Sequence, residues 1–235
     1  MKNYLRCLVV AIAAATPSLG LAQTVLANWT FETSIPATLP SSGPYAAEGG
    51  VNSSSSFASG SHAGAATYST LTGNGSARSY SSNTWAVGDY YQFTTSTTGF
   101  SNIAVTWDQI GSNTGPKLFD LKYSFDGTNF TTFASYTVVT ASWSSSTQHT
   151  GAETFSFDLS SITTLNEAAT VTFRLVDTST TAINGTTVGT AGTGRVDNFT
   201  ITSVPEPSTY AAIFGGVALA GAFWQRHRSR KIATA

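Results

Sequence analysis

The sequence is poor in cysteine, and its only cysteine, Cys7, lies in an apolar segment near the amino terminus. This segment, residues 7–15, follows two basic residues and precedes the small-residue sequence Gly-Leu-Ala at 20–22. The order is typical of a secretory signal peptide over residues 1–22, cleaved before Gln23. An uncleaved anchor is the alternative, but the apolar segment is shorter than the ~20 residues of a membrane span. The mature chain would contain no cysteine, which excludes a disulfide, a thiolate nucleophile and a Cys-ligated zinc.

Basic residues are scarce between the two ends of the chain. Residues 23–203 contain five basic and eleven acidic side chains, so their net charge is about −6 although the whole chain is close to neutral. An acidic body disfavours nucleic-acid binding, which needs basic side chains to neutralise phosphates. A basic cluster at 226–231 directly follows an apolar run at 209–224. That order indicates the cytoplasmic flank of a membrane segment rather than a nucleic-acid tail.

Residues 23–203 are also poor in long helix formers, and no stretch keeps a 3.6-residue hydrophobic period. Alternation with period two is frequent instead, and glycine, serine and asparagine separate the alternating segments. About 180 residues are enough to bury one sizeable core. We therefore expect an all-β domain over residues 23–203, a two-sheet antiparallel β-sandwich. The clearest expected strands are 28–32, 89–95, 103–107, 119–125, 155–159, 171–177 and 196–201.

Local signals add three expectations. Asp126-Gly127 lies between the segments 117–125 and 129–139, which predicts a hairpin because glycine accepts the positive φ that such turns need. The Ser/Gly/Ala-rich stretch 49–66 predicts a long loop or a loose edge. Trp107 alternates in phase with apolar neighbours, which indicates a core position.

Signatures of enzymes are missing. The chain has no Gly-x-Ser-x-Gly elbow, His-Glu-x-x-His pair or phosphate-binding loop. His62 and His149 have no partner at the sequence spacing of a metal site or a catalytic triad. We therefore expect no enzymatic activity. A secreted glycan hydrolase stays an alternative, because its carboxylate pair is defined by separation across a cleft and not by sequence.

The carboxyl-terminal residues form a tail of three parts. Pro205, Glu206 and Pro207 come first, the apolar run 209–224 follows, and the basic cluster 226–231 comes last. The apolar run has about sixteen residues, which is marginal for a stable transmembrane helix. An ordinary carboxyl-terminal membrane anchor is the alternative to a tail that is removed.

Residues 204–235 resemble the PEP-CTERM sorting signal, which exosortase recognises in Gram-negative bacteria, often beside exopolysaccharide and biofilm genes. The resemblance implies export through Sec, a transient inner-membrane anchor formed by residues 209–224, and cleavage near the Pro-Glu-Pro motif. It further implies delivery to the cell surface or to the extracellular matrix.

The body resembles the jelly-roll domains often attached to this tail, which are similar to carbohydrate-binding modules. The resembling segments are 28–32, 121–130 and 194–201. In such modules the first and last strands lie side by side and share a structural calcium, which implies a calcium site at Glu32 and Asp197. Calcium prefers carboxylate and carbonyl oxygens. Two solvated strand-end carboxylates are the alternative interpretation.

Sugar rings stack on exposed aromatic side chains. Trp85 and Trp143 lie in polar, Ser/Thr-rich segments, so we expect them to be exposed and name them as candidate glycan-binding residues, with packing of a loop as the alternative. Three functions remain open: a non-enzymatic surface or matrix protein associated with exopolysaccharide, a dedicated glycan-binding module, and a secreted glycan hydrolase.

Overall fold

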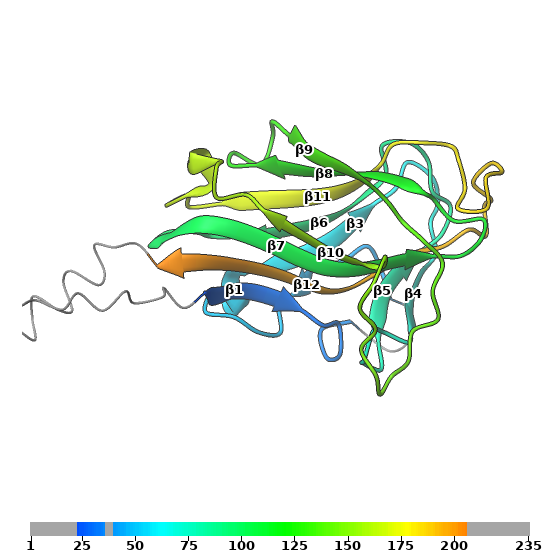
Figure 1. The fold of residues 1–235 in the computed structure, drawn as a ribbon, viewed down its shortest axis with the longest axis horizontal. Helices are drawn as coiled ribbons and strands as arrows, with labels where there is room; N and C mark the ends of the chain where they lie inside the picture. The colour runs from blue at the N-terminus through cyan, green and yellow to red at the C-terminus, as the bar shows by residue number, and fades with distance from the viewer. Residues whose placement is uncertain (1–22, 36–39, 206–235) are drawn as a thin grey trace, which may run out of the picture.

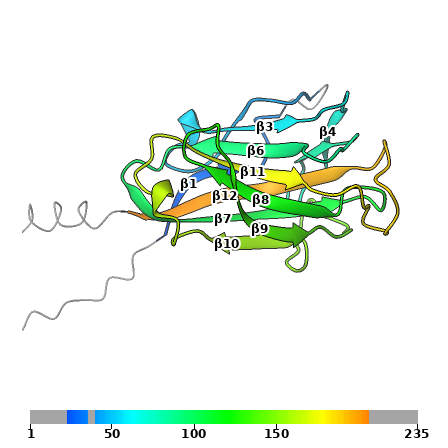
Figure 2. The same ribbon diagram turned by 90° about the horizontal axis from the view of Figure 1, so that it is seen from above.

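The structure, a computed structural model, describes residues 23–35 and 40–205, which fold into two antiparallel sheets packed against each other (Figures 1 and 2). Two short 3-10 helices, η1 (Ser53–Ser55) and η2 (Thr163–Leu165), interrupt the strands. The strands are β1 (Thr24–Trp29), β2 (Tyr45–Ala46), β3 (Phe57–Ser61), β4 (Tyr68–Leu71), β5 (Ser79–Ser82), β6 (Tyr90–Thr95), β7 (Phe100–Gly111), β8 (Leu118–Ser124), β9 (Thr131–Thr137), β10 (Thr154–Asp158), β11 (Val171–Asp177) and β12 (Gly194–Pro205). The prediction of an all-β, two-sheet antiparallel fold is confirmed.

Each sheet has six strands. Sheet A has the order β10-β7-β12-β5-β4, and β1 pairs with the other half of the β12 edge that β5 occupies. Sheet B has the order β2-β3-β6-β11-β8-β9. The first and last strands are therefore neighbours, with Trp29 opposite Phe199. This adjacency brings the amino-terminal segment of the domain beside residues 194–205.

Aromatic rings from both sheets form the centre of the core. Phe93 of sheet B stacks on Phe199 of sheet A with ring centroids 3.6 Å apart. Trp29 meets Phe93 edge-on at 5.3 Å, and Trp107 stacks on Phe199 at 5.7 Å. All four side chains are at most 1% exposed, which confirms the expected core position of Trp107. Burial of such large rings removes apolar area from water and thereby stabilises the sandwich.

A β-bulge interrupts β12 between Asp197 and Thr200. Asn198 has a φ of 52°, a left-handed conformation that asparagine tolerates better than most residues. Side chains three positions apart on a regular strand point to opposite faces, yet Val196 and Phe199 are both buried in the core. The bulge explains how both side chains reach the core, because it interrupts the alternation of side chains between the two faces of β12 at Asp197 and Asn198.

The hairpin predicted at Asp126-Gly127 is confirmed, because β8 and β9 pair antiparallel around it. Gly127 has a φ of 73°, and Asp126 Oδ1 accepts bonds from the backbone N–H groups of Thr128 and Asn129. For the stretch 49–66, the expectation of a long loop is wrong at β3, which pairs with β6. The alternative of a loose edge is closer to the structure, because on its other side β3 is paired at only two positions, by the two-residue edge strand β2.

The physical reason for the error is packing. A Cβ at Gly60 would come within 2.8 Å of both the Tyr68 ring and the Tyr80 hydroxyl, so β3 uses small residues where large side chains come close. Strand β5 shows a related effect, since all four of its residues are buried although three are serines. Neither β3 nor β5 shows the alternation of apolar and polar residues from which a strand is predicted in a sequence.

Within residues 23–35 and 40–205 no helix is long and apolar enough to cross a membrane. The predicted signal peptide at 1–22 and the predicted transmembrane helix at 209–224 lie outside the described residues, as do Glu206, Pro207 and the basic tail. Pro205 is the last residue of β12 and pairs with Phe100. These predictions therefore stay predictions.

Candidate functional site

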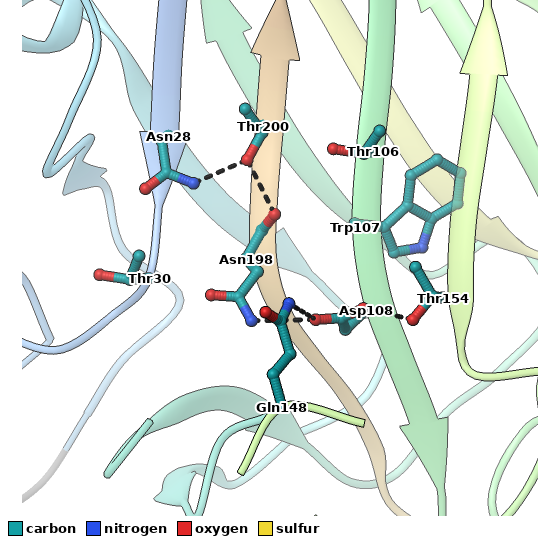
Figure 3. A pocket seen from close by; sticks show the side chains of 9 residues that line it. All are labelled: Asn28, Thr30, Thr106, Trp107, Asp108, Gln148, Thr154, Asn198 and Thr200. Carbon is teal, nitrogen blue, oxygen red and sulfur yellow. Dashed lines mark hydrogen bonds between the residues drawn. The ribbon is translucent and has the colours of Figure 1, made fainter. Parts of the chain in front are cut away.

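A polar groove of about 310 Å³ crosses four neighbouring strands of sheet A, and we call it the sheet A groove (Figure 3). Strands β1, β12, β7 and β10 each contribute residues, and Gln148 reaches it from the segment before β10. The lining residues are Asn28, Thr30, Thr106, Trp107, Asp108, Gln148, Thr154, Asn198 and Thr200. Hydroxyl, amide and carboxylate groups thus dominate a surface built on rigid strands.

Asp108 is the central acceptor of the sheet A groove and is 2% exposed. Its Oδ1 accepts a hydrogen bond from Thr154 Oγ1 at 2.8 Å, and its Oδ2 accepts one from Asn198 Nδ2 at 2.9 Å. Gln148 Nε2 donates to the same Oδ2 at 3.5 Å (Figure 3). These bonds hold the groove's polar side chains in fixed orientations.

A second chain of bonds fixes the other half of the groove. Asn28 Nδ2 donates to Thr200 Oγ1 at 2.7 Å, and Thr200 Oγ1 donates to the carbonyl oxygen of Asn198 at 3.0 Å (Figure 3). Asn198, at the bulge, links this chain of bonds to the first one, because its side-chain amide donates to Asp108 Oδ2. A preorganised polar surface loses little conformational entropy when a ligand binds.

Asp197 lies next to the sheet A groove and opposite Asp108 in the strand register. Its Oδ2 accepts hydrogen bonds from Asn74 N at 2.7 Å and Ser76 Oγ at 2.8 Å, and its Oδ1 accepts one from Asn198 N at 2.8 Å. Burial of the side chain, with a smaller effect of the nearby Asp108 carboxylate, raises the pKa of Asp197 to about 7, although the three hydrogen bonds lower it.

The predicted calcium residues Glu32 and Asp197 contact the same short segment. Glu32 Oε1 accepts a bond from Arg78 N at 2.6 Å, while Asp197 contacts the start of the segment at Asn74 and Ser76. The adjacency of the first and last strands, on which the prediction rested, is confirmed. Among the described residues, no group of three or more His, Cys, Asp or Glu side chains is arranged to hold a metal.

Oxygen atoms nevertheless converge beside Gly73. A Cβ built on Gly73 would collide with Ser76 Oγ, the carbonyl oxygen of Arg78 and Asp197 Oδ2. The ion pairs of the described residues do not include Asp197. Hydrogen bonds from Ser76 Oγ already join these oxygens, and the Arg195 guanidinium interacts electrostatically with Asp197. Carboxylate, carbonyl and hydroxyl oxygens are nevertheless the donor types that calcium prefers.

The expectation that Trp85 and Trp143 are exposed is wrong. Trp85 is 7% exposed, and its Nε1 donates to the carbonyl oxygen of Ser82 at 3.0 Å. Trp143 is 9% exposed, with the Arg195 guanidinium 5.8 Å from its ring centroid. Both indoles pack against neighbouring loops and strands, and nothing in the polar residues around them in the sequence indicated this packing. Their role in glycan binding stays a prediction, without the open ring face that stacking on a sugar needs.

His62 has partners that sequence spacing did not indicate. Its Nδ1 lies 3.0 Å from Asp89 Oδ2, and its Nε2 lies 2.9 Å from Ser82 Oγ. The connectivity is that of a Ser-His-Asp triad. However, Ser82 is only 1% exposed and its hydroxyl also bonds to Tyr91 Oη at 2.8 Å. A buried serine cannot reach a substrate carbonyl, so this chain of bonds is structural.

No family model and no curated protein matches this chain. Among solved structures, the K2 cleaved adhesin domain of Lys-gingipain aligns with a TM-score of 0.44 at 16% identity, over 78% of this chain and 100% of that one. The CBM22-2 xylan-binding domain of Paenibacillus barcinonensis Xyn10C aligns with a TM-score of 0.44 at 12% identity, over 75% and 98%. TmCBM61, solved with β-1,4-galactotriose, aligns with a TM-score of 0.36 at 12% identity, over 63% and 88%. Likeness at these values assigns this chain neither a family nor a ligand.

Proposed function

We propose that the body is a non-enzymatic glycan-binding β-sandwich of the jelly-roll type, and that the sheet A groove is its ligand surface. The observation that carries the proposal is the hydrogen-bond network around Asp108, which holds amide and hydroxyl side chains in place on an open strand surface. Sugar hydroxyls both donate and accept hydrogen bonds, so they match such a surface. Sequence reasoning missed these residues because four separate segments supply them.

The geometry favours binding over hydrolysis. A glycosidase needs two carboxyl groups that face a cleft from opposite sides of the scissile bond. Asp108 is 2% exposed and accepts three hydrogen bonds, and Asp197, its partner in the β7–β12 register, is fully buried. Neither carboxyl is free to protonate a leaving group.

The test is binding of the recombinant body, residues 23–203, to an array of polysaccharides. Gln148→Ala and Thr154→Val each remove a polar group from the sheet A groove, and we expect each to weaken binding about tenfold, the cost of one lost hydrogen bond with its desolvation. Gln92→Ala is the matched control, because Gln92 lies on β6 of sheet B. Sugar release that depends on Asp108 would favour the hydrolase. An equal loss of affinity in all three variants would contradict the sheet A groove as the ligand surface.

We further propose that Glu32 and Asp197 hold a structural calcium, with Ser76 Oγ and the Arg78 carbonyl as additional ligands. A divalent cation would neutralise the ionised Asp197 carboxylate and fix residues 73–78 against β12. Calcium should raise the melting temperature of the body at pH 8, and chelation should lower it. Asp197→Ala should abolish the effect, whereas Asp158→Asn, an exposed carboxylate, should keep it. A melting temperature that changes neither with calcium nor with chelator would exclude the calcium site.

The export route is also part of the proposal. We propose that the signal peptide directs the chain through Sec, that exosortase cleaves near Pro205-Glu206-Pro207, and that the body reaches the cell surface or matrix in association with exopolysaccharide. Support comes from the order of the three-part tail and from the absence of cysteine in residues 23–235. Mass spectrometry of the extracellular protein should show Gln23 as the first residue and no apolar tail. An intact segment 209–224 in that fraction would refute sorting.

A further inference from the structure

A second pocket, of about 260 Å³, lies where the loop after β5 meets the loop after β11, and we call it the Asp177 pocket. The loop after β11 runs at the end of the sandwich opposite the end of β12 (Figure 1). The lining residues are Trp85, Ala86, Val87, Asp177, Ser179, Thr180, Thr187 and Val188. Apolar side chains, hydroxyls and one carboxyl group thus share a small space.

Asp177 is the unusual member of this set. The side chain is 1% exposed and its Oδ2 has no hydrogen-bond partner in the protein, while Oδ1 accepts one bond from Ser179 N at 3.2 Å. Buried carboxylate oxygens are almost always paired, because an unpaired one loses its hydration without replacement. Because Asp177 lines the pocket, a rotation of its side chain would present this unpaired acceptor to a ligand.

The charge around Asp177 favours a cationic donor. The backbone N–H of Asp177 donates to the carbonyl oxygen of Asp89 at 2.9 Å, so two acidic residues are close neighbours. The ion pairs of the described residues are His62 with Asp89 and Lys122 with Asp120, and neither includes Asp177. Burial lowers the pKa of His62, which favours its neutral form, so the contact of His62 with Asp89 adds little positive charge beside Asp177.

The remaining walls restrict the shape of the ligand. Val87 and Val188 present apolar surface, and Trp85 contributes the aromatic wall. Ser179 and Thr187 add hydroxyls beside that surface. Drug-sized ligands occupy pockets of ~300–1,000 Å³, so this smaller space suits one sugar ring and not a chain. A lysine side chain would satisfy the carboxylate but leave the hydroxyls unmatched.

We propose that the Asp177 pocket binds one amino-sugar residue of a glycan, with the ammonium group on the Asp177 carboxylate and the C–H face of the sugar ring against Val87 and Val188. The inference rests on the proposed glycan-binding function and adds a second subsite with a defined ligand class, a sugar that carries a free amino group. The sheet A groove binds neutral hydroxyls, and the Asp177 pocket selects charge.

The test is titration of the body with glucosamine, glucose and N-acetylglucosamine, followed by amide NMR shifts at pH 7.5. Glucosamine should bind at least tenfold more tightly than the other two, with shifts at residues 177–188. Asp177→Asn should weaken glucosamine binding at least tenfold, and Asp158→Asn should leave it unchanged. Val188→Phe should fill the pocket and abolish binding without touching the carboxyl group, provided that cooperative unfolding shows an intact fold.

Three outcomes would overturn the inference: equal binding of glucose, unchanged affinity in both pocket variants, or equally tight binding of Nα-acetyl-lysine amide, which would indicate a protein partner. The two proposals fail separately. Neutral glycans that bind through Gln148 while glucosamine does not would leave the proposed function standing and remove the amino-sugar subsite. Glucosamine binding at residues 177–188 without any response to groove variants would have the opposite meaning.

Discussion

Asp197 of sheet A and Asp177 of sheet B are both buried aspartates on strands, yet their surroundings differ. Asp197 accepts three hydrogen bonds from residues 74, 76 and 198. Asp177 accepts one bond from Ser179 N and keeps one oxygen without a partner. Burial raises the pKa of Asp197 to about 7 and that of Asp177 to about 6. A raised pKa alone therefore does not separate a structural carboxyl from a binding one.

Hydrogen-bond partners separate the two cases. The segment 73–78 folds over Asp197 and supplies donors from its backbone and from Ser76, so the protein satisfies that carboxyl itself. The loop after β11 supplies only Ser179 N to Asp177 and leaves a pocket beside it. We infer that the first carboxyl serves the fold and a structural cation, and the second serves a ligand.

Truncation of each aspartate should give the largest difference between the two regions. Asp197→Ala should lower the free energy of unfolding by about 3–5 kcal/mol, because it removes the acceptor of three hydrogen bonds, one buried and two part-buried. Asp177→Ala should lower it by less than about 1 kcal/mol, since it removes one weak bond and one unpaired oxygen. Urea unfolding at pH 5 measures both, and equal losses would break the comparison.

Closure of the segment 73–78 over Asp197 should be nearly as sensitive. Gly73→Ala should lower the free energy of unfolding by about 3 kcal/mol, because its Cβ would displace Ser76, Arg78 and Asp197 oxygens at once. Gly49→Ala is the matched control, since its Cβ would meet Asn28 at an ordinary 3.7 Å. Urea unfolding of both variants measures the difference, and a Gly73→Ala variant as stable as Gly49→Ala would show that the segment yields easily.

A smaller effect should appear in the pH dependence of stability. The folded pKa of Asp197, about 7, exceeds the unfolded value of about 3.8, so its contribution is complete below about pH 4 and is lost as the pH rises through 7. In the presence of a chelator, the Asp197 contribution to stability should therefore fall by about 2.5 kcal/mol between pH 5 and pH 8. Asp177, whose pKa is raised to about 6, should add a smaller fall of the same sign.

His62 acts with the opposite sign, because its lowered pKa favours the folded state at higher pH. Hydrogen bonds from Thr30 and from neighbouring backbone groups lower the pKa of Glu48 to about 2. Its contribution to stability is therefore lost only as the pH falls below 4.5. The difference between the wild-type and Asp197→Ala melting curves across this range isolates the aspartate. Identical slopes for the two proteins would contradict the burial argument.

The fold was predictable wherever one face of a strand is apolar. Strand β6 alternates between half-buried and buried residues, and β7 contains the expected positions of Ile103 and Trp107. Prediction failed where burial involves small or polar residues. Gly60 is close to tyrosine rings, and the serines of β5 are buried because their hydroxyls bond to partners such as the Gly194 carbonyl.

The candidate site was less predictable than the fold. Glu32 and Asp197 were named from a resemblance, and the structure brings both to one segment, 74–78. Asp108 looked like one scattered acid among many, and only the β7–β12 register places it opposite Asp197. Asp177 gave no signal, because its unpaired oxygen is a property of the loops around it.

Sequence alone determined a cysteine-free, acidic, all-β body, because period-two alternation and composition are local properties of the chain. Tertiary structure decided the rest. The bulge at Asn198 set which side chains line the sheet A groove, and packing buried Trp85 and Trp143 against expectation. Whether Asp197 and Asp177 are satisfied depends on donors more than a hundred residues away in one case and two residues away in the other. Folding decides which of these donors reach each carboxylate, because it brings the strands and loops into contact.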